Sequence, residues 1–266
     1  MDSILQALVL GLVQGVTEFI PVSSSGHLIL VRDFFGIVAT PADLAFDAVL
    51  QLATAISVAW YFRKDLINLL LAFGRKLQGH HVDEEYRVLF LSLVLGTIPA
   101  VLAGLLLEDS METLFRSSTL VAWTLIVGAV LMYSADRIGS QKDGLTVRKG
   151  FFVGLFQVLA LVPGISRSGA TISGGLFAGL NRENAIRFSF LLGFPILFGS
   201  GIKKLLELLS AGALDTLGAS LVIGSIAAFV SGLAAIHFLV SYLKRHGLSV
   251  FVFYRVALAV LILVFL

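Results

Sequence analysis

Long apolar stretches, separated by short polar segments, run through most of the chain. A helix that crosses a membrane needs roughly 17–25 predominantly apolar residues, and the chain has several uninterrupted stretches of about that length. They cover residues 43–62, 88–107, 119–136, 188–204, 217–243 and 250–266. This pattern predicts an all-α membrane protein, a polytopic bundle with six spanning helices.

Two further apolar stretches are interrupted near their middles by polar segments. Residues 3–31 are broken at 21–27, and residues 150–180 are broken at 163–169. Their halves are too short for two full crossings, so each stretch is predicted to form a re-entrant helical hairpin. Irregular backbone at membrane depth is tolerated only where protein or a water-filled cavity satisfies its hydrogen bonds. The two breaks therefore predict a polar cavity.

A shift of 143 residues, without gaps, superimposes the two broken stretches. It places Gly11 on Gly154, Leu12 on Leu155, Gln14 on Gln157, Ser23 on Ser166, Ser25 on Ser168 and Gly26 on Gly169. A weaker match, of a kind that apolar helices also produce by chance, appears at a shift of 128 and aligns Gly96 with Gly224. The sequence thus predicts one integral membrane domain, 1–266, with repeat 1 over about 1–140 and repeat 2 over about 150–266.

Basic residues gather in three connecting regions. They follow the first span (Arg63, Lys64, Arg75, Lys76, Arg87), the third (Arg137, Lys142, Arg148, Lys149) and the fifth (Lys244, Arg245). The positive-inside rule places these regions in the cytoplasm, although Lys203 and Lys204 then lie on the outer side. Because three spans follow the first hairpin, the two halves would have opposite orientations. This is an inverted-topology repeat whose hairpin tips meet near the middle of the membrane.

Composition agrees with this class of protein. The chain is 58% hydrophobic and 14% charged, against about 25% charged residues in a soluble domain. Its basic residues are distributed over several connecting regions and form no single patch, which predicts no nucleic-acid partner. Cysteine is absent, which excludes disulfides and thiolate metal sites. Asp2 is the only charged side chain before Glu18, unlike a signal peptide with its basic start, so we expect the first apolar stretch to be retained.

The first break carries side chains capable of chemistry. Gln14 and Glu18 are four residues apart and share one helix face, and three serines and His27 follow. A carboxylate within a bilayer is costly and is functional by default. The alternatives are a solvated helix end for Glu18 and a packing role for His27. The cluster of acid, hydroxyls and imidazole favours an active site.

The second break predicts an anion site. Backbone N–H groups at the start of a helix attract anions, and Arg167 lies there between Ser166 and Ser168. Arginine suits bidentate phosphate recognition. The alternatives are that Arg167 reaches the lipid surface or pairs with Glu18, and the second is compatible with catalysis. Elsewhere, residues 80–85 contain two histidines and three acids, but a solvated loop is favoured over a metal site because nothing apolar holds them rigid.

Both breaks together suit the hydrolysis of a phosphoanhydride. Such a reaction needs stabilisation of charge on the transferring phosphoryl group and a residue that handles the proton. A transporter or a polyprenyl-phosphate flippase is the alternative, because inverted repeats and broken helices are features of transporters. A channel is less favoured, since no ring of polar residues lines a continuous span.

Two motifs resemble a known family. Residues 14–27 (QGVTEFIPVSSSGH) are similar to the first signature of the bacterial undecaprenyl-diphosphate phosphatases, the bacitracin-resistance family, and residues 163–171 (PGISRSGAT) to the second. The likeness extends over nearly the whole chain. It implies hydrolysis of undecaprenyl diphosphate in the bacterial inner (plasma) membrane, with Mg²⁺ or Ca²⁺ as cofactor and the site open to the outer, periplasmic side. A homodimer stays open.

The resemblance also implies roles for individual residues. Glu18 would be the essential acid, acting on water, on a nucleophile or as the metal ligand. Ser24 would be the nucleophile that forms a phospho-enzyme or would merely hold the phosphate, His27 would be its proton partner and Arg167 the diphosphate clamp. The remaining candidates would bind substrate: Gln14, Ser23, Ser25, Gly26, Ser166, Ser168, Gly169 and Thr171. Many members of the family carry a glutamate in place of Gln14, so this chain argues against schemes with two carboxylates on the metal.

Overall fold

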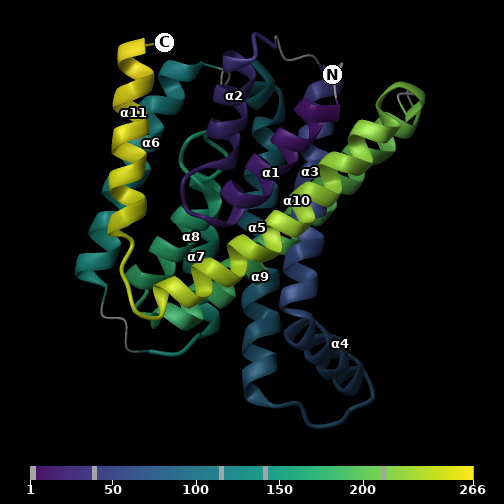
Figure 1. Ribbon diagram of the computed structural model, residues 1–266. Coiled ribbons are helices and arrows are strands. Elements are labelled where there is room, and N and C mark those ends of the chain that lie inside the picture. The colour runs from purple at the N-terminus through teal and green to yellow at the C-terminus, as the bar shows by residue number, and fades with distance from the viewer. Residues whose placement is uncertain (1–3, 38–40, 114–116, 140–142, 211–213, 266) are drawn as a thin grey trace.

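The computed structural model describes residues 4–37, 41–113, 117–139, 143–210 and 214–265, and these ranges are helical throughout apart from short connections (Figure 1). The helices are α1 (Ile4–Phe19), α2 (Ser24–Phe34), α3 (Pro41–Tyr61), α4 (Arg63–Leu77), α5 (Glu84–Thr113), α6 (Ser118–Ile138), α7 (Val147–Leu159), α8 (Arg167–Phe177), α9 (Arg182–Ser210), α10 (Leu214–Leu243) and α11 (Ser249–Phe265). The expected all-α class is confirmed for these residues.

Several helices are long and apolar enough to cross a membrane. Four pass on length and composition alone: α5, α6, α9 and α10. The helix pair α3 and α4, bent by 78° at its break, raises the number of candidate spans to five. Five of the six stretches expected to span therefore coincide with these candidates. The sixth, residues 250–266, coincides with α11, which is apolar but has only 17 residues.

Both expected helix breaks are present. Residues 20–23 separate α1 from α2, and residues 160–166 separate α7 from α8. Ser23 (φ 76°) and Ser166 (φ 74°) are the only residues other than glycine with positive φ in the described ranges. Each hydroxyl accepts a hydrogen bond from the backbone N–H three residues later, at Gly26 and Gly169. The two breaks thus share a capping geometry as well as sequence.

Small residues bring the helices that carry the breaks close to their neighbours. α1 packs along α10, and α7 packs along α5. A Cβ atom added to Gly11 would lie 2.3 Å from the carbonyl oxygen of Gly224, and one added to Gly154 would lie 2.2 Å from that of Gly96. Close approach of backbones at glycine is a typical packing mode of helices in membranes. It brings α1 and α7 close to their partner helices near the middle of each helix.

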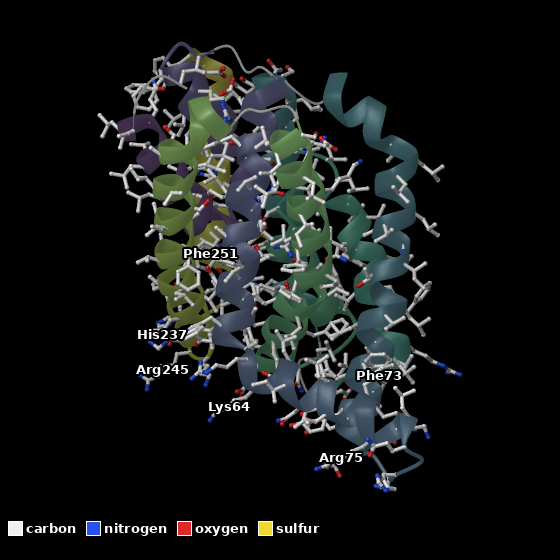
Figure 2. The ribbon with its side chains drawn as sticks, turned by 90° about the vertical axis from the view of Figure 1, so that its right-hand side faces the viewer. Lys64, Phe73, Arg75, His237, Arg245 and Phe251 are labelled. Atoms are coloured by element: carbon white, nitrogen blue, oxygen red, sulfur yellow. The ribbon has the colours of Figure 1, made fainter. Side chains whose placement is uncertain are left out.

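The region after the first span differs from expectation. We interpreted residues 63–87 as a connecting loop, but residues 63–77 form the helix α4. Apolar residues at positions 66, 69, 70, 73 and 77 have the spacing of an amphipathic helix, and others lie at 67, 71 and 72. Similarly, α5 continues to Thr113, into the expected loop at 108–118. Figure 1 shows α4 at the lower end of the molecule, and Figure 2 shows Lys64, Arg75 and Arg245 at one common end.

Candidate active site

An ion pair joins the two helix breaks. Glu18 lies in the last turn of α1, and Arg167 is the first residue of α8. The Nη2 atom of Arg167 donates a hydrogen bond of 2.5 Å to Oε1 of Glu18, and the two side chains are 14% and 5% exposed, respectively. The expected proximity of the acid and the guanidinium is therefore confirmed.

The second oxygen of the Glu18 carboxylate binds two further donors. Ser24 Oγ donates to Oε2 at 2.7 Å, and Gln14 Nε2 donates to the same oxygen at 2.9 Å. The Gln14 amide is buried, and its Oε1 atom has no hydrogen-bond partner among the described residues. A hydroxyl hydrogen-bonded to an oriented carboxylate is the arrangement of a nucleophile beside a general base.

Ser23 connects the first break to the second. Its Oγ accepts hydrogen bonds from the backbone N–H groups of Gly164 (3.1 Å) and Gly26 (3.4 Å), and it lies 3.3 Å from Oγ of Ser25. These bonds fix the two turns against each other. They also mean that Ser23, which we expected to bind substrate, is committed to the protein backbone.

The serines of the second break repeat part of this arrangement. Ser166 Oγ accepts from the backbone N–H of Gly169 at 3.2 Å and lies 3.2 Å from Oγ of Ser168. Thr171 is fully buried, donates to the carbonyl oxygen of Arg167 and lies 2.5 Å from Oγ of Ser189 on α9. Among the described residues, the hydrogen bonds of these expected substrate residues support the turn that carries Arg167, and none of them goes to Glu18.

His27 is turned away from the carboxylate. Its Nδ1 lies 2.7 Å from the carbonyl oxygen of Ser23, and its Nε2 lies 2.7 Å from the hydroxyl of Tyr254 on α11. The two rings are nearly parallel, with centroids 5.7 Å apart. Both ring nitrogens are thus engaged, and neither is hydrogen-bonded to Ser24 or Glu18.

α9 packs against the surroundings of both residues of the ion pair. Gly193 leaves the space that the guanidinium of Arg167 occupies, because a Cβ atom at this position would lie 1.3 Å from Nη1. Phe190, one turn earlier on α9, packs edge-to-face against Phe19 at the end of α1, with ring centroids 5.4 Å apart. One helix thereby positions both the acid and its partner.

Two residues of α11 that contact the breaks were not predicted from the sequence. Arg255 is fully buried and hydrogen-bonds to backbone carbonyls in both breaks, and Tyr254 binds His27. The stretch 250–266 was assigned by its average hydrophobicity alone. A lone arginine inside an apolar stretch was the available signal, since ionisable residues in membrane segments are rare and usually have a function.

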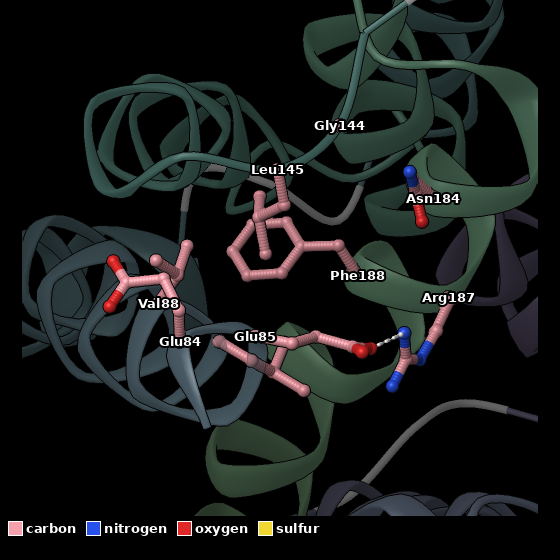
Figure 3. A pocket seen from close by; sticks show the side chains of 9 residues that line it. Glu84, Glu85, Val88, Gly144, Leu145, Asn184, Arg187 and Phe188 are labelled. Atoms are coloured by element: carbon pink, nitrogen blue, oxygen red, sulfur yellow. Dashed lines mark hydrogen bonds and ion pairs between the residues drawn. The ribbon is translucent and has the colours of Figure 1, made fainter. Parts of the chain in front are cut away.

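A pocket of about 300 Å³ lies at a different place, between the starts of α5 and α9 and residues 144–145 (Figure 3). Glu85 and Arg187 in its wall form an ion pair of 2.8 Å. Apolar side chains, among them Phe188, make up most of the remaining lining. None of the residues around Glu18 contributes to this pocket, so it is separate from the candidate site.

Fold and site together define a multi-pass α-helical membrane protein whose buried acid, hydroxyl and guanidinium converge from two helix breaks. The sequence model of the family described as "Bacitracin resistance protein BacA" matches residues 7–261. The chain therefore belongs to this family.

The chain aligns with curated relatives over almost their entire lengths. The chain is 42% identical to an undecaprenyl-diphosphatase of Thermobifida fusca, with 98% of this chain and 89% of the relative aligned. It is 42% identical to an undecaprenyl-diphosphatase of Rubrobacter xylanophilus, with 98% of each aligned. A relative of the same name from Mycobacterium sp. (strain KMS) is 43% identical over 98% of this chain and 96% of its own length. The chain thus aligns with whole proteins rather than with isolated motifs.

Proposed function

We propose that this chain hydrolyses undecaprenyl diphosphate to undecaprenyl phosphate and inorganic phosphate, which recycles the lipid carrier for cell-wall synthesis. Its relatives bear the name of this activity and align over nearly their full length. The single structural observation that carries the proposal is the Glu18 carboxylate, bonded on one side to Arg167 and on the other to Ser24. A flippase alone would not require a hydroxyl beside a buried base.

The chemistry begins at Ser24. Its Oγ attacks the terminal phosphorus of the diphosphate while its proton passes to Oε2 of Glu18, which already accepts that hydrogen bond. The bond between this phosphorus and the bridging oxygen breaks, and undecaprenyl phosphate leaves. Glu18 passes this proton to the leaving undecaprenyl phosphate and becomes a base again. It then accepts a proton from water, which attacks the phosphoserine, and returns that proton to Ser24 Oγ as inorganic phosphate is released.

Arg167 supplies the positive charge for this reaction. Its fork of N–H donors suits the oxygens of a phosphoryl group, and one of these donors is bonded to Glu18 in the structure. Charge that develops on the phosphoryl oxygens in the transition state is stabilised by donors already in place. Gln14 donates to Oε2, the same oxygen that accepts from Ser24, so donors hold both oxygens of the carboxylate.

A divalent cation, Mg²⁺ or Ca²⁺, fits the oxygen donors of this site. Mg²⁺ is commonly held by one or two carboxylates together with substrate phosphates. Glu18 supplies one carboxylate, and the unpartnered Oε1 of Gln14 is a second buried oxygen beside it. No group of three histidine or acidic side chains converges within the described residues, so most ligands would come from substrate and water. When bound, the cation would neutralise charge on the diphosphate.

We further propose six spans and two re-entrant hairpins arranged as an inverted repeat. Three features support this arrangement. The α1–α10 and α7–α5 contacts are equivalent pairs under the two sequence shifts. Backbone hydrogen bonds join Asp143, before α7, to Gly179 and Asn181, after α8, so this hairpin leaves where it enters. In Figure 1, the outer ends of α1 and α2 lie at the upper end of the molecule, and those of α7 and α8 at the lower.

The orientation follows from charge. The end that carries Lys64, Arg75 and Arg245 (Figure 2) would face the cytoplasm of a bacterial inner membrane. The first hairpin would then enter from the periplasmic side and leave the site open to that side. The Glu18, Ser24 and Arg167 contacts all lie within one chain, so the mechanism does not require a homodimer.

The test is phosphate release by the purified protein in detergent micelles with Mg²⁺. Undecaprenyl diphosphate should give inorganic phosphate with turnover, whereas undecaprenyl phosphate should give none. The same preparation in liposomes tests the transporter alternative. Movement of lipid across the bilayer without phosphate release would overturn the proposed function.

A further inference from the structure

Arg255 is a buried arginine in an otherwise uncharged helix. It is the only charged residue of the 17 in α11, and its exposed fraction is 0%. A buried cation is expensive unless its donors are satisfied. Within the described part of the chain, Arg255 forms no ion pair with a carboxylate. Its cost must therefore be offset by other contacts.

Those contacts are backbone carbonyls from three separate elements. Nη2 of Arg255 donates to the carbonyl oxygen of Gly164 in the second break at 2.7 Å, and Nη1 donates to that of Pro21 in the first break at 3.3 Å. Further bonds reach Leu125 (3.1 Å) and Thr124 (3.4 Å) on α6. One guanidinium thus spans both breaks and the helix beside them.

These bonds matter because a broken helix leaves backbone carbonyls without intrahelical partners. Pro21 follows Glu18 by three residues, and Gly164 precedes Arg167 by three residues. A fork of donors fixed to both carbonyls therefore sets the distance between the acid and its partner. The slot for this fork is left by Gly128 on α6, where a Cβ atom would lie 2.1 Å from Nη2.

We propose that Arg255 is a positioning residue: its guanidinium holds the two helix breaks together so that Glu18 and Ser24 from one meet Arg167 from the other. The inference rests on the proposed function, because it assigns this role for catalysis at that site. Arg255 does not itself touch Glu18 or Ser24. Its effect on turnover is exerted through the positions of these side chains.

The first test replaces Arg255 by lysine. Arg255→Lys keeps the positive charge but cannot reach all four carbonyls with one nitrogen. A displacement of about 1 Å at the reacting groups costs on the order of 100-fold in rate, so we expect kcat for undecaprenyl diphosphate to fall by about that factor with little change in KM. Arg32→Lys is the matched control, because Arg32 is also buried but pairs with Asp47, away from both breaks. It should leave kcat near the wild-type value.

The second test leaves Arg255 unchanged and alters its surroundings. Gly128→Ala places a methyl group in the slot of the guanidinium and should lower kcat on its own. This variant tests the positioning role of Arg255 even if Arg255→Lys does not fold. Lysine does not need the whole slot, so Gly128→Ala should cost much less in the Arg255→Lys background. Such non-additivity is the signature of two residues that act through one contact.

The outcomes separate this inference from the proposed function. Absence of phosphate release by the wild-type protein would remove the proposed function itself. With an active wild type, the positioning role is wrong if Arg255→Lys and Gly128→Ala both keep normal kcat. It is equally wrong if Arg255→Lys raises KM alone, because Arg255 would then contribute to substrate binding, or if the two substitutions are strictly additive.

Discussion

Glu18 and Arg167 are 149 residues apart in sequence and form a 2.5 Å ion pair at the meeting point of two interrupted helices. Each residue lies beside a break whose last residue, a serine, has positive φ and caps the next helix. The site thus exists only when both breaks are formed and in contact. Substitutions at Glu18 or Arg167 should therefore abolish activity, whereas their effect on stability should depend on whether the remaining charge is balanced. Activity and thermal unfolding, measured on the same variants, separate the two effects.

Stability should depend on the balance of charge in this pair. Glu18→Gln leaves Arg167 buried without a counter-charge, and removal of one partner from a buried pair costs about 3–5 kcal/mol. The double variant Glu18→Gln/Arg167→Gln should melt closer to the wild type than either single variant, while remaining inactive. Thermal unfolding in micelles measures this effect.

A surface pair provides the control for the same measurement. Glu207→Gln removes the exposed pair of Glu207 with Lys204, and exposed pairs contribute about 0–1 kcal/mol. The melting temperature should hardly change. If the double variant at the site unfolds as early as the worse single variant, the ion pair is not what stabilises this region.

Gly193 on α9 should be intolerant of any side chain. Gly193→Ala would place a methyl group at the guanidinium of Arg167, and the resulting displacement should lower kcat by about 100-fold. Gly199→Ala on the same helix is the control, because nothing lies within 4 Å of the added Cβ atom. Steady-state phosphate release compares the two variants. Similar kcat values for both would show that Arg167 does not need this slot.

Much of the architecture was predictable because it is encoded locally. The apolar stretches and their polar interruptions determined the helix breaks, and the matching residues of the two breaks indicated that Glu18 and Arg167 meet. α4 was missed because basic residues at its ends masked the helical spacing of its leucines. Periodicity, examined alongside charge, would have identified it.

The missed contacts are those made between distant segments. Tyr254 reaches His27 across 227 residues, and no motif links them. The family resemblance paired His27 with Ser24, whereas the structure engages both ring nitrogens of His27 elsewhere. The slot at Gly193 likewise depends on how α9 crosses α8, which sequence periodicity cannot reveal.

Ser24 should be essential and Ser25 dispensable. Ser24 Oγ is bonded to the Glu18 carboxylate, whereas Ser25 Oγ lies beside Ser23. Ser24→Ala should abolish turnover, and rapid quenching of the wild-type reaction should trap phosphate on Ser24, detectable by mass spectrometry. Ser25→Ala should retain most activity. Substantial turnover by Ser24→Ala would instead indicate direct attack by water.

The divalent cation should be required and should respond to Gln14. Chelator should stop phosphate release, and added Mg²⁺ should restore it. Gln14→Glu adds a second carboxylate beside Glu18 and should lower the Mg²⁺ concentration needed for half-maximal activity, because carboxylate is a better ligand than amide. Undiminished turnover in chelator would exclude the cation from the mechanism.

Phosphate release from undecaprenyl diphosphate by Glu18→Gln and Arg167→Gln, each compared with wild type at matched folded fraction, tests the central claim most directly. A shared role of the two residues predicts rapid release by the wild type and none above background by either variant. Turnover within tenfold of wild type in a folded Glu18→Gln or Arg167→Gln protein would contradict the claim that these two breaks jointly form the active site.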